Sequence, residues 1–363
     1  MRILSISKFH FDYRGGIEKE AKRVSNQLGV KYKIDTICFG SRDTLDVLSA
    51  NERIFTFSSC RILRKVDISL SMVKFLLRRA KDYHVVWVHY PNILPVIFLS
   101  TRRWRNKTII IQYQNDIKVL PFLYVLFRPF ERRLLNKAEV IITSSPQYHL
   151  YSQALKSFSG KVRPIPIRLK GVQVHGYKLK PNQDRDIVLT AVGRYTQYKG
   201  YEKLVKLVAN VSGFRLNIVC SSQMPENLIN SIESSANIVI QRNLDDSELE
   251  NLLVSTHVFV LSSISRNEGF GIVLLEALRL GIPICVNKIE GTGSEFITKP
   301  GVNGEFFHID EPKSFYEAIG QITNESRYED YCKEALNDFN SRFRSNDSYE
   351  FLEVLDSLVH TAL

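Results

Sequence analysis

The stretch VFVLSSISRNEGFGIVLLEALRLGIP, residues 258–283, reads as a strand, a loop and a helix in succession. A short apolar run comes first, and a helical pattern extends from about Gly271 to Gly281, just before Pro283. Strand, loop and helix in this order form the unit from which parallel sheets with helices on both faces are built. The stretch therefore predicts an α/β fold.

Two glutamates lie in these apolar surroundings. Glu268 belongs to the loop, beside Gly269 and Gly271, whose missing side chains let a ligand touch the backbone. Glu276 lies about one and a half turns into the helix. A buried carboxylate needs partners, and one interpretation pairs Glu276 with Arg279 on the surface. The other is a sugar ligand, because ribose and hexose offer paired O–H donors.

The same alternation of strand and helix patterns extends over both halves of the chain. The predicted strands are residues 2–7, 33–39, 84–90, 108–114 and 139–145, then 187–193, 214–221, 237–242, 258–263 and 282–287, with second-half helices at about 201–210, 245–254, 271–281 and 312–322. We therefore predict two doubly wound domains, residues 1–166 and 187–335, which imply a cleft between them. Residues 167–186 read as a linker, and 336–363 as a helical tail that packs back on the first domain.

Composition is that of an ordinary globular chain. The 363 residues are 44% hydrophobic and 24% charged, and five scattered cysteines form no C-x-x-C pair. This cysteine pattern fits a reducing compartment. Residues 1–13 read as a strand and not as a signal peptide, and no apolar run approaches the length of a membrane-spanning helix. We expect a cytoplasmic protein.

Charge is unevenly divided between the halves. Residues 1–166 hold 29 Lys and Arg against 12 Asp and Glu, whereas the remainder holds 20 against 26. A basic face suits nucleic acid, anionic lipid or a phosphorylated substrate. The chain has no zinc-finger spacing, no ribonucleoprotein motif and no basic region that leads into heptads, so we expect no nucleic-acid partner.

Two glycine-containing loops follow predicted strands. Gly15 and Gly16 precede the first helix, where backbone N–H groups and the helix N-terminus favour an anion; the alternative is a tight turn without a ligand. Arg194 and Lys199 lie in the loop after the strand at 187–193. They present a planar fork of donors and a point charge to a diphosphate, unless the loop is simply solvated.

These motifs together resemble the retaining glycosyltransferases of family 4. The resemblance rests on the two glutamates separated by seven residues, the Gly-Arg and Lys-Gly loop, and the Gly-Gly turn, which occur in the expected order over nearly the whole chain. It implies the GT-B fold, in which two Rossmann-like doubly wound domains face a central cleft. The first would bind the acceptor and the second the nucleotide sugar.

The resemblance also implies roles for the residues of the second domain. Glu268 would contact the transferred sugar, and Glu276 would hold the nucleotide ribose. Arg194 and Lys199 would bind the donor diphosphate. The donor would also lie against the loop Gly269, Phe270 and Gly271, and Gly15 and Gly16 would lie across the cleft near the donor phosphate and the acceptor.

In the first domain, residues 109–148 are similar to bacterial mannosyl and related transferases of lipopolysaccharide and O-antigen assembly. Those enzymes often carry a His-x-Asp at the strand end, but here Gln114 takes the histidine position before Asn115 and Asp116. Asp116 remains the candidate for the acceptor hydroxyl. The resemblance thus implies transfer of a hexose, mannose first, from a GDP- or UDP-linked donor to a lipid-linked or saccharide acceptor of O-antigen, lipopolysaccharide or capsule.

The chemistry needs neither a metal nor another cofactor. Transfer from a nucleotide sugar builds negative charge on the leaving diphosphate, and fixed cations meet that need. The D-x-D at Asp184 to Asp186 lies in the predicted linker and reads as a solvated edge. Two other classes stay open: an epimerase-like or phosphorylase-like enzyme of the same fold, and a non-catalytic binder of nucleotide sugars or polyanions.

The basic half also contains a candidate membrane surface. Residues 61–81 combine cations such as Arg78, Arg79 and Lys81 with apolar side chains, and Trp104 lies among further cations. An amphipathic helix of this kind can lie on an anionic membrane. The alternative is that its apolar side packs on the sheet. We expect a peripheral protein at the inner face of the cell membrane.

Overall fold

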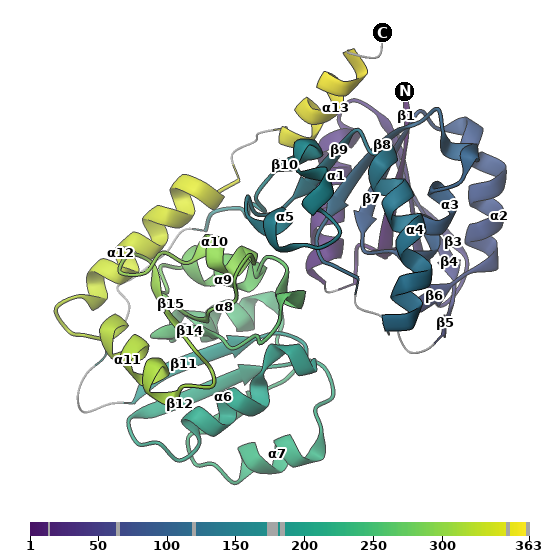
Figure 1. Ribbon diagram of the computed structural model, residues 1–363. Coiled ribbons are helices and arrows are strands. Elements are labelled where there is room, and N and C mark those ends of the chain that lie inside the picture. The colour runs from purple at the N-terminus through teal and green to yellow at the C-terminus, as the bar shows by residue number, and fades with distance from the viewer. Residues whose placement is uncertain are drawn as a thin grey trace. The chain divides into compact units, whose positions relative to one another are not determined.

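The computed structural model describes residues 1–13, 15–62, 66–117, 121–172, 181, 186–345 and 349–360. It divides into two compact units, residues 1–166 with 347–363, and residues 167–346 (Figure 1). Each unit contains a mainly parallel sheet with helices packed on it. The predicted pair of doubly wound α/β units is therefore confirmed.

The sheet of the first unit has the strand order β10-β9-β8-β7-β1-β2-β4-β3. Its strands are β1 (Arg2–Phe9), β2 (Lys33–Gly40), β3 (Thr44–Val47), β4 (Glu52–Ser58), β7 (Val85–Tyr90), β8 (Thr108–Tyr113), β9 (Val140–Thr143) and β10 (Val162–Pro164). All neighbours pair in parallel except β3, which is antiparallel to β4. A separate hairpin joins β5 (Cys60–Ile62) to β6 (Val66–Ile68). The sequence patterns missed β3, β4, β5, β6 and β10.

Apolar side chains alternate between two cores on opposite faces of this sheet. Val86 and Val88 of β7 enter one core, whereas Val85 and Trp87 enter the other. A strand that is buried on both faces reads as a continuous apolar run, which explains residues 84–90. The helices of the unit are α1 (Gly16–Gly29), α2 (Leu70–Arg79), α3 (Ile93–Leu99), α4 (Pro121–Lys137), α5 (Tyr148–Tyr151) and α13 (Glu350–His360).

The C-terminal helix α13 belongs to the first unit (Figure 1). Phe351 packs edge-on against Trp87 with 5.6 Å between ring centroids. Asp356 accepts hydrogen bonds from Lys31 at 2.7 Å and from the hydroxyl of Tyr32 at 2.5 Å. The two hydrogen bonds of Asp356 join residues more than 300 positions apart in sequence.

The second unit has a six-stranded, fully parallel sheet in the order β13-β12-β11-β14-β15-β16. Its strands are β11 (Ile187–Val192), β12 (Phe214–Val219), β13 (Ile238–Gln241), β14 (Val258–Leu261), β15 (Ile284–Asn287) and β16 (Gly304–Phe307), and its helices are α6 (Tyr201–Val208), α7 (Glu226–Glu233), α8 (Asp246–Val254), α9 (Ile272–Leu278), α10 (Gly293–Ile297), α11 (Pro312–Ile322) and α12 (Tyr328–Asp338). The five predicted strands and four predicted helices are present. The sequence patterns missed α7, α10 and β16.

The second unit begins earlier and ends later than the predicted domain. Phe339 and Phe343 follow α12 and are fully buried in the core around α9, so the unit extends to residue 346 and not 335. Ile167 enters the same core, and the N–H of Leu169 donates to the carbonyl of Phe343 at 2.9 Å. Residues 173–180 and 182–185 of the predicted linker lie outside the described residues.

Helix α2 uses its apolar face inside the protein. Met72 and Leu76 are fully buried, and the ring of Phe75 packs on that of Phe55 with 5.1 Å between centroids. Trp104 is also buried. The alternative in which this face packs on the sheet is therefore the one observed. Through the described part of the chain, no helix has the length and apolarity to cross a membrane.

His89 of β7 gives the first unit a sensitivity to acid. Its ring is fully buried, with Nε2 at 3.4 Å from the hydroxyl of Ser5, and burial lowers the pKa of His89 to about 3 although a hydrogen bond with Gln112 acts in the opposite direction. An unfolded histidine titrates near 6.5. As the pH falls, His89 is protonated in the unfolded state before it is protonated in the folded state. The first unit therefore loses stability as the pH falls from the unfolded pKa toward the folded one.

We predict that this histidine removes about 2 kcal/mol of stability between pH 7.5 and pH 5. Trp87 and Trp104 are the two tryptophans of the chain and both lie in the first unit, so tryptophan fluorescence during urea unfolding reports on that unit. The free energy of unfolding of the wild type, minus that of His89→Gln, should fall by about 2 kcal/mol from pH 7.5 to pH 5. A difference that is the same at both would contradict the prediction.

Candidate functional site

The two central strands of the second unit, β11 and β14, lie side by side at the point where the strand order reverses. The loops that leave their carboxyl ends diverge to opposite sides of the sheet, and such a switch point is where open parallel sheets bind ligands. Residues 193–200 follow β11, and residues 262–271 follow β14. Both loops contain residues that the sequence singled out.

A buried ion pair joins these loops. The ammonium Nζ of Lys199 lies 3.1 Å from Oε1 and 2.9 Å from Oε2 of Glu268. The hydroxyl of Ser263 donates to Oε2 of the same carboxylate. Both charged side chains are at least nine-tenths covered. Glu268 is thus a buried carboxylate with specific partners, as its apolar surroundings required.

The backbone around the pair is fixed by further contacts between the two loops. The hydroxyl of Ser262 donates to the carbonyl of Lys199 at 2.8 Å, and the N–H of Ile264 donates to the carbonyl of Tyr198 at 2.7 Å. Gly200 has φ +69°, and a Cβ there would lie 2.2 Å from the carbonyl oxygen of Ser262. Only glycine permits this approach.

The negative charge of Glu268 stabilises the positive charge of Lys199. Burial by itself lowers the pKa of Lys199, but the Glu268 carboxylate more than offsets this, so that the pKa of Lys199 is raised above its ordinary value. Lys199 is therefore a permanent cation at neutral pH. Arg194 lies on the same loop with an exposed side chain. The loop after β11 thus presents one buried and one exposed cation.

The loop Gly269, Phe270 and Gly271 leads into α9. Gly269 and Gly271 have φ +38° and +84°, so both need a residue without Cβ. The side chain of Phe270 is buried, with its ring 6.4 Å from that of Phe343, and it anchors the loop in the core. Glu276 lies on the half-buried side of α9. Arg279, its suggested surface partner, forms an ion pair with Glu250 at 3.5 Å.

In the first unit, the Gly-Gly turn follows β1 and leads into α1. The carboxylate of Glu18 folds back over Gly15, where a Cβ would lie 2.1 Å from its Oε2. Glu18 is buried and lies in the first turn of α1, where a negative charge is favourable. The Glu18 carboxylate of the protein itself therefore occupies the space beside Gly15.

Asp116 lies beyond the carboxyl end of β8 in a network of hydroxyl groups. Its carboxylate accepts hydrogen bonds from Tyr113 at 2.9 Å and from Ser152, and its N–H donates to the hydroxyl of Tyr148 at 2.9 Å. Two causes raise the pKa of Tyr113 well above its ordinary value: first its burial, and then the negative charge of Asp116. The hydroxyl therefore stays protonated and donates its hydrogen bond. The position of Asp116 is fixed before any ligand binds.

Four buried polar atoms in the segments after β8 and β9 have no hydrogen-bond partner within the described residues. They are Nε2 of Gln114, Oδ1 of Asn115, Oγ of Ser145 and Nδ1 of His149. All four residues follow the carboxyl ends of β8 or β9. Buried polar groups are normally paired, so atoms of this kind indicate where a polar ligand or water would bind.

Sequence reasoning missed Ser145 and His149 here, and Ser262 and Ser263 in the second unit. Each follows the carboxyl end of a strand in a parallel sheet, and that position was a usable signal. Asp184 of the D-x-D lies outside the described residues. Elsewhere in the described chain, no group of three or more His, Cys, Asp or Glu is placed to hold a metal ion.

Comparison with known proteins identifies the second half of the chain. Residues 178–338 match the family model described as glycosyl transferases group 1. The chain carries a glycosyl transferases group 1 domain, and its enzyme class is that of a glycosyltransferase. Arg194, Lys199, Glu268 and Glu276 all lie within this domain, whereas Asp116 lies outside it.

Similar proteins cover the full length of this glycosyltransferase. The O-antigen chain mannosyltransferase C of Escherichia coli is 25% identical over 99% of this chain and 97% of its own. The structure of sucrose-phosphate synthase from Thermosynechococcus elongatus matches with a TM-score of 0.78 at 18% identity, over all of both chains. Anabaena HepE in complex with UDP and glucose matches with a TM-score of 0.70 at 14% identity, over 100% and 99%. The fold is GT-B.

The buried ion pair predicts a strong coupling in stability. Lys199→Met leaves the Glu268 carboxylate buried without its cation, which should cost about 3–5 kcal/mol. The double variant Lys199→Met/Glu268→Leu should cost less than the sum of the single variants by about 1–3 kcal/mol. Denaturation followed by circular dichroism measures each value, and Arg194→Ala, at an exposed position, is the control. Additive costs would contradict the pair.

Proposed function

We propose that this protein is a retaining glycosyltransferase of family 4 type that transfers a hexose, mannose first among the candidates, from a GDP- or UDP-linked donor. The acceptor is a hydroxyl of a lipid-linked or saccharide chain of bacterial surface polysaccharide. The observation that carries the proposal is the buried Lys199–Glu268 pair at the switch point of the second unit, with Arg194 on the same loop.

The donor diphosphate is proposed to bind at Arg194 and Lys199. A diphosphate brings two or more negative charges, and a planar guanidinium with a buried ammonium meets them without rearrangement. Glu268 holds the ammonium in place, so the side-chain entropy of Lys199 is already lost before the donor arrives. As the glycosidic bond breaks, charge grows on the leaving phosphate oxygen, and these cations stabilise it.

The transferred sugar is proposed to donate a hydroxyl to Glu268. A carboxylate accepts about four hydrogen bonds. Lys199 contacts both oxygens and Ser263 contacts Oε2, which leaves capacity on Oε1. Glu276 on the half-buried side of α9 is the proposed partner of the ribose hydroxyls. Carboxylates suit both tasks because adjacent sugar hydroxyls are paired donors.

The acceptor is proposed to bind beyond the carboxyl ends of β8 and β9. Asp116 would orient the acceptor hydroxyl, and the side chains of Gln114 and His149 offer polar atoms for neighbouring hydroxyls. The bond between the anomeric carbon and the donor phosphate oxygen breaks while the bond to the acceptor oxygen forms on the same face. The leaving phosphate oxygen takes the acceptor proton, so no other base is needed.

The biological setting of the proposal draws on the relatives. A mannosyltransferase of the O-antigen is similar over the full chain, and HepE, of similar fold, is seen with UDP and glucose. Lipid-linked acceptors reside in the membrane, so we place this transferase at the inner face of the cell membrane. The decisive experiment is a panel of GDP- and UDP-linked sugars tested by thermal shift, then by transfer to saccharide acceptors.

The product reports on the reaction class. Nuclear magnetic resonance of the new linkage should show the anomeric configuration of the donor. An inverted product would overturn the retaining mechanism, isomerised donor without acceptor would indicate an epimerase, and binding without turnover would indicate a non-catalytic binder.

Arg194→Ala should lower turnover by roughly 10²-fold, because it deletes a cation that meets transition-state charge. Lys199→Ala should lower it at least as much. Since Arg194 is exposed, its loss should leave the melting temperature unchanged. The matched control is Arg215→Ala, an exposed arginine at the amino end of β12, whereas Arg194 follows the carboxyl end of the neighbouring strand β11. Equal turnover in Arg194→Ala and the control would remove the diphosphate assignment.

Glu268→Gln should impair sugar transfer, whereas Glu276→Gln should impair nucleotide binding. With Glu268→Gln we expect sugar transfer to be lost while the affinity for the free nucleoside diphosphate stays within about threefold. Glu276→Gln should weaken that affinity by about tenfold, the usual cost of losing a hydrogen bond to a charged group. Calorimetry with GDP and UDP measures both. Loss of nucleotide binding in Glu268→Gln would show that the carboxylate acts chiefly by holding Lys199 and not by contacting the sugar.

A further inference from the structure

Helix α4 of the first unit presents an apolar stripe to solvent. Phe122, Val125 and Leu126 are exposed by 62%, 69% and 67%, and Pro129, one turn further, is also exposed. The spacing places these side chains on one side of the helix. Single exposed apolar residues are ordinary, but a contiguous set of them indicates a surface that another body covers.

The opposite side of α4 is fixed to the sheet, so the stripe cannot turn inward. Phe127 and Leu134 are buried in the core. The carboxylate of Glu131 accepts hydrogen bonds from the hydroxyls of Tyr90 and Tyr124, the latter at 2.9 Å. Rotation of the helix would break this network and expose a buried carboxylate.

Exposed charges around the stripe have one sign. The exposed cations on α4 and on the turn after α3 are Arg102, Arg103, Arg105, Arg128, Arg132 and Arg133. Residues 93–137 contain two acidic side chains, Asp116 and Glu131. Asp116 accepts the hydroxyls of Tyr113 and Ser152, and Glu131 is buried. The surface therefore attracts anions without an acidic side chain at its centre.

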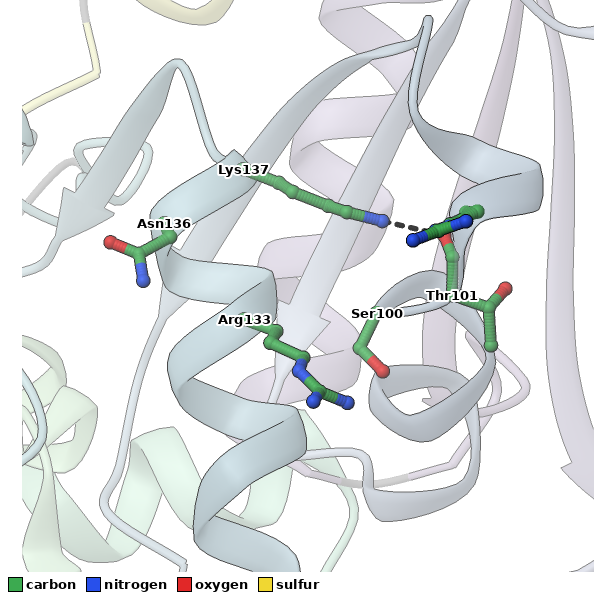
Figure 2. A pocket seen from close by; sticks show the side chains of 6 residues that line it. Ser100, Thr101, Arg133, Asn136 and Lys137 are labelled. Carbon is green, nitrogen blue, oxygen red and sulfur yellow. Dashed lines mark hydrogen bonds between the residues drawn. The ribbon is translucent and has the colours of Figure 1, made fainter.

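A pocket adjoins the basic end of the stripe. It has a volume of about 500 Å³ and is lined by Ser100, Thr101, Arg102, Arg133, Asn136 and Lys137 (Figure 2). Lys137 donates to the carbonyls of Leu99 and Thr101, and this fixes one wall of the pocket. Arg102 and Arg133 bring guanidinium groups, whose fork of donors fits a phosphate.

Stripe and pocket share one helix face. Arg133 lies eleven residues after Phe122, which is three turns of helix and about 16 Å. An interfacial helix buries its apolar side chains about 5–10 Å into the boundary between headgroups and acyl chains, and keeps its cations at the level of the phosphates. The face of α4 has this arrangement along its length.

We propose that α4 and the turn at Arg102–Trp104 form the surface that docks on an anionic lipid bilayer. Phe122, Val125 and Leu126 enter the headgroup region, and Arg132, Arg133 and the pocket hold lipid phosphates. The inference goes beyond the proposed function, because it assigns the membrane-facing surface and does not depend on sugar transfer. It also replaces α2, whose apolar side is core.

Co-sedimentation of the full chain with vesicles tests the proposal. Binding should require phosphatidylglycerol in phosphatidylcholine vesicles and fall with salt. Arg132→Gln/Arg133→Gln should weaken partitioning by about 20-fold, and Phe122→Ser/Val125→Ser/Leu126→Ser by at least about tenfold. The charge-matched control, Arg78→Gln on α2 with Lys81→Gln in the turn that follows it, should change partitioning by less than about twofold. Equal loss in the control, or equal binding to neutral vesicles, would overturn the proposal.

Fluorescence locates the contact independently of affinity. Trp87 and Trp104 are buried, so a new tryptophan at an exposed position is the one that brominated lipid can reach. Val125→Trp should be quenched by brominated vesicles, whereas Leu77→Trp, at an exposed position of α2, should not. Quenching of the α2 probe alone would overturn the assignment, as would retention on a polyanion column without vesicle binding. Sugar transfer to a soluble acceptor should be unchanged in the α4 variants. A failure of the membrane proposal can therefore be told apart from a failure of the proposed sugar transfer.

Discussion

The buried pair of Lys199 and Glu268 is the interaction on which the second unit's site depends. It spans the gap between loops that leave neighbouring strands in opposite directions, so neither loop can move without separating two charges in a dry environment. The loops are shaped for it: Gly200 permits the approach of the backbone, and Ser263 supplies a further donor. A pair of this kind adds little net stability, but it holds a cation at the position where a phosphate would bind.

The first unit satisfies its carboxylates in another way. Asp116 and Glu131 accept hydrogen bonds from tyrosine and serine hydroxyls, although arginine and lysine outnumber aspartate and glutamate in the same unit. Neutral donors leave the surroundings of Asp116 polar without a strong field. That suits the orientation of a sugar hydroxyl, whereas the fixed cations of the second unit suit a diphosphate. The two units thus differ in the electrostatic surroundings of their carboxylates.

Exposure, and not composition, distinguishes the basic surfaces of the first unit. Helices α2 and α4 both mix arginines with apolar residues. In α2 the apolar side meets the sheet through Met72 and Leu76, whereas α4 anchors itself through Glu131 and Phe127 and leaves Phe122 and Val125 in solvent. An amphipathic pattern states that a helix has an apolar side. It does not predict how much of that side is buried in the core.

The sequence by itself determined the two α/β units, the glycine-bearing loops and the importance of Glu268, because strand and helix periods and turn residues are local properties. It also separated Lys199 and Arg194 from other cations by their place after a strand. The sequence also predicted that a C-terminal helical tail packs on the first domain, as α13 does. Only the tertiary structure decided that Lys199 and Glu268, 69 residues apart, form one pair. The order of strands in a sheet brings such residues together, and no local pattern of side chains encodes that order. The hydroxyl network around Asp116 and the outward face of α4 were decided in the same way, by packing between distant segments.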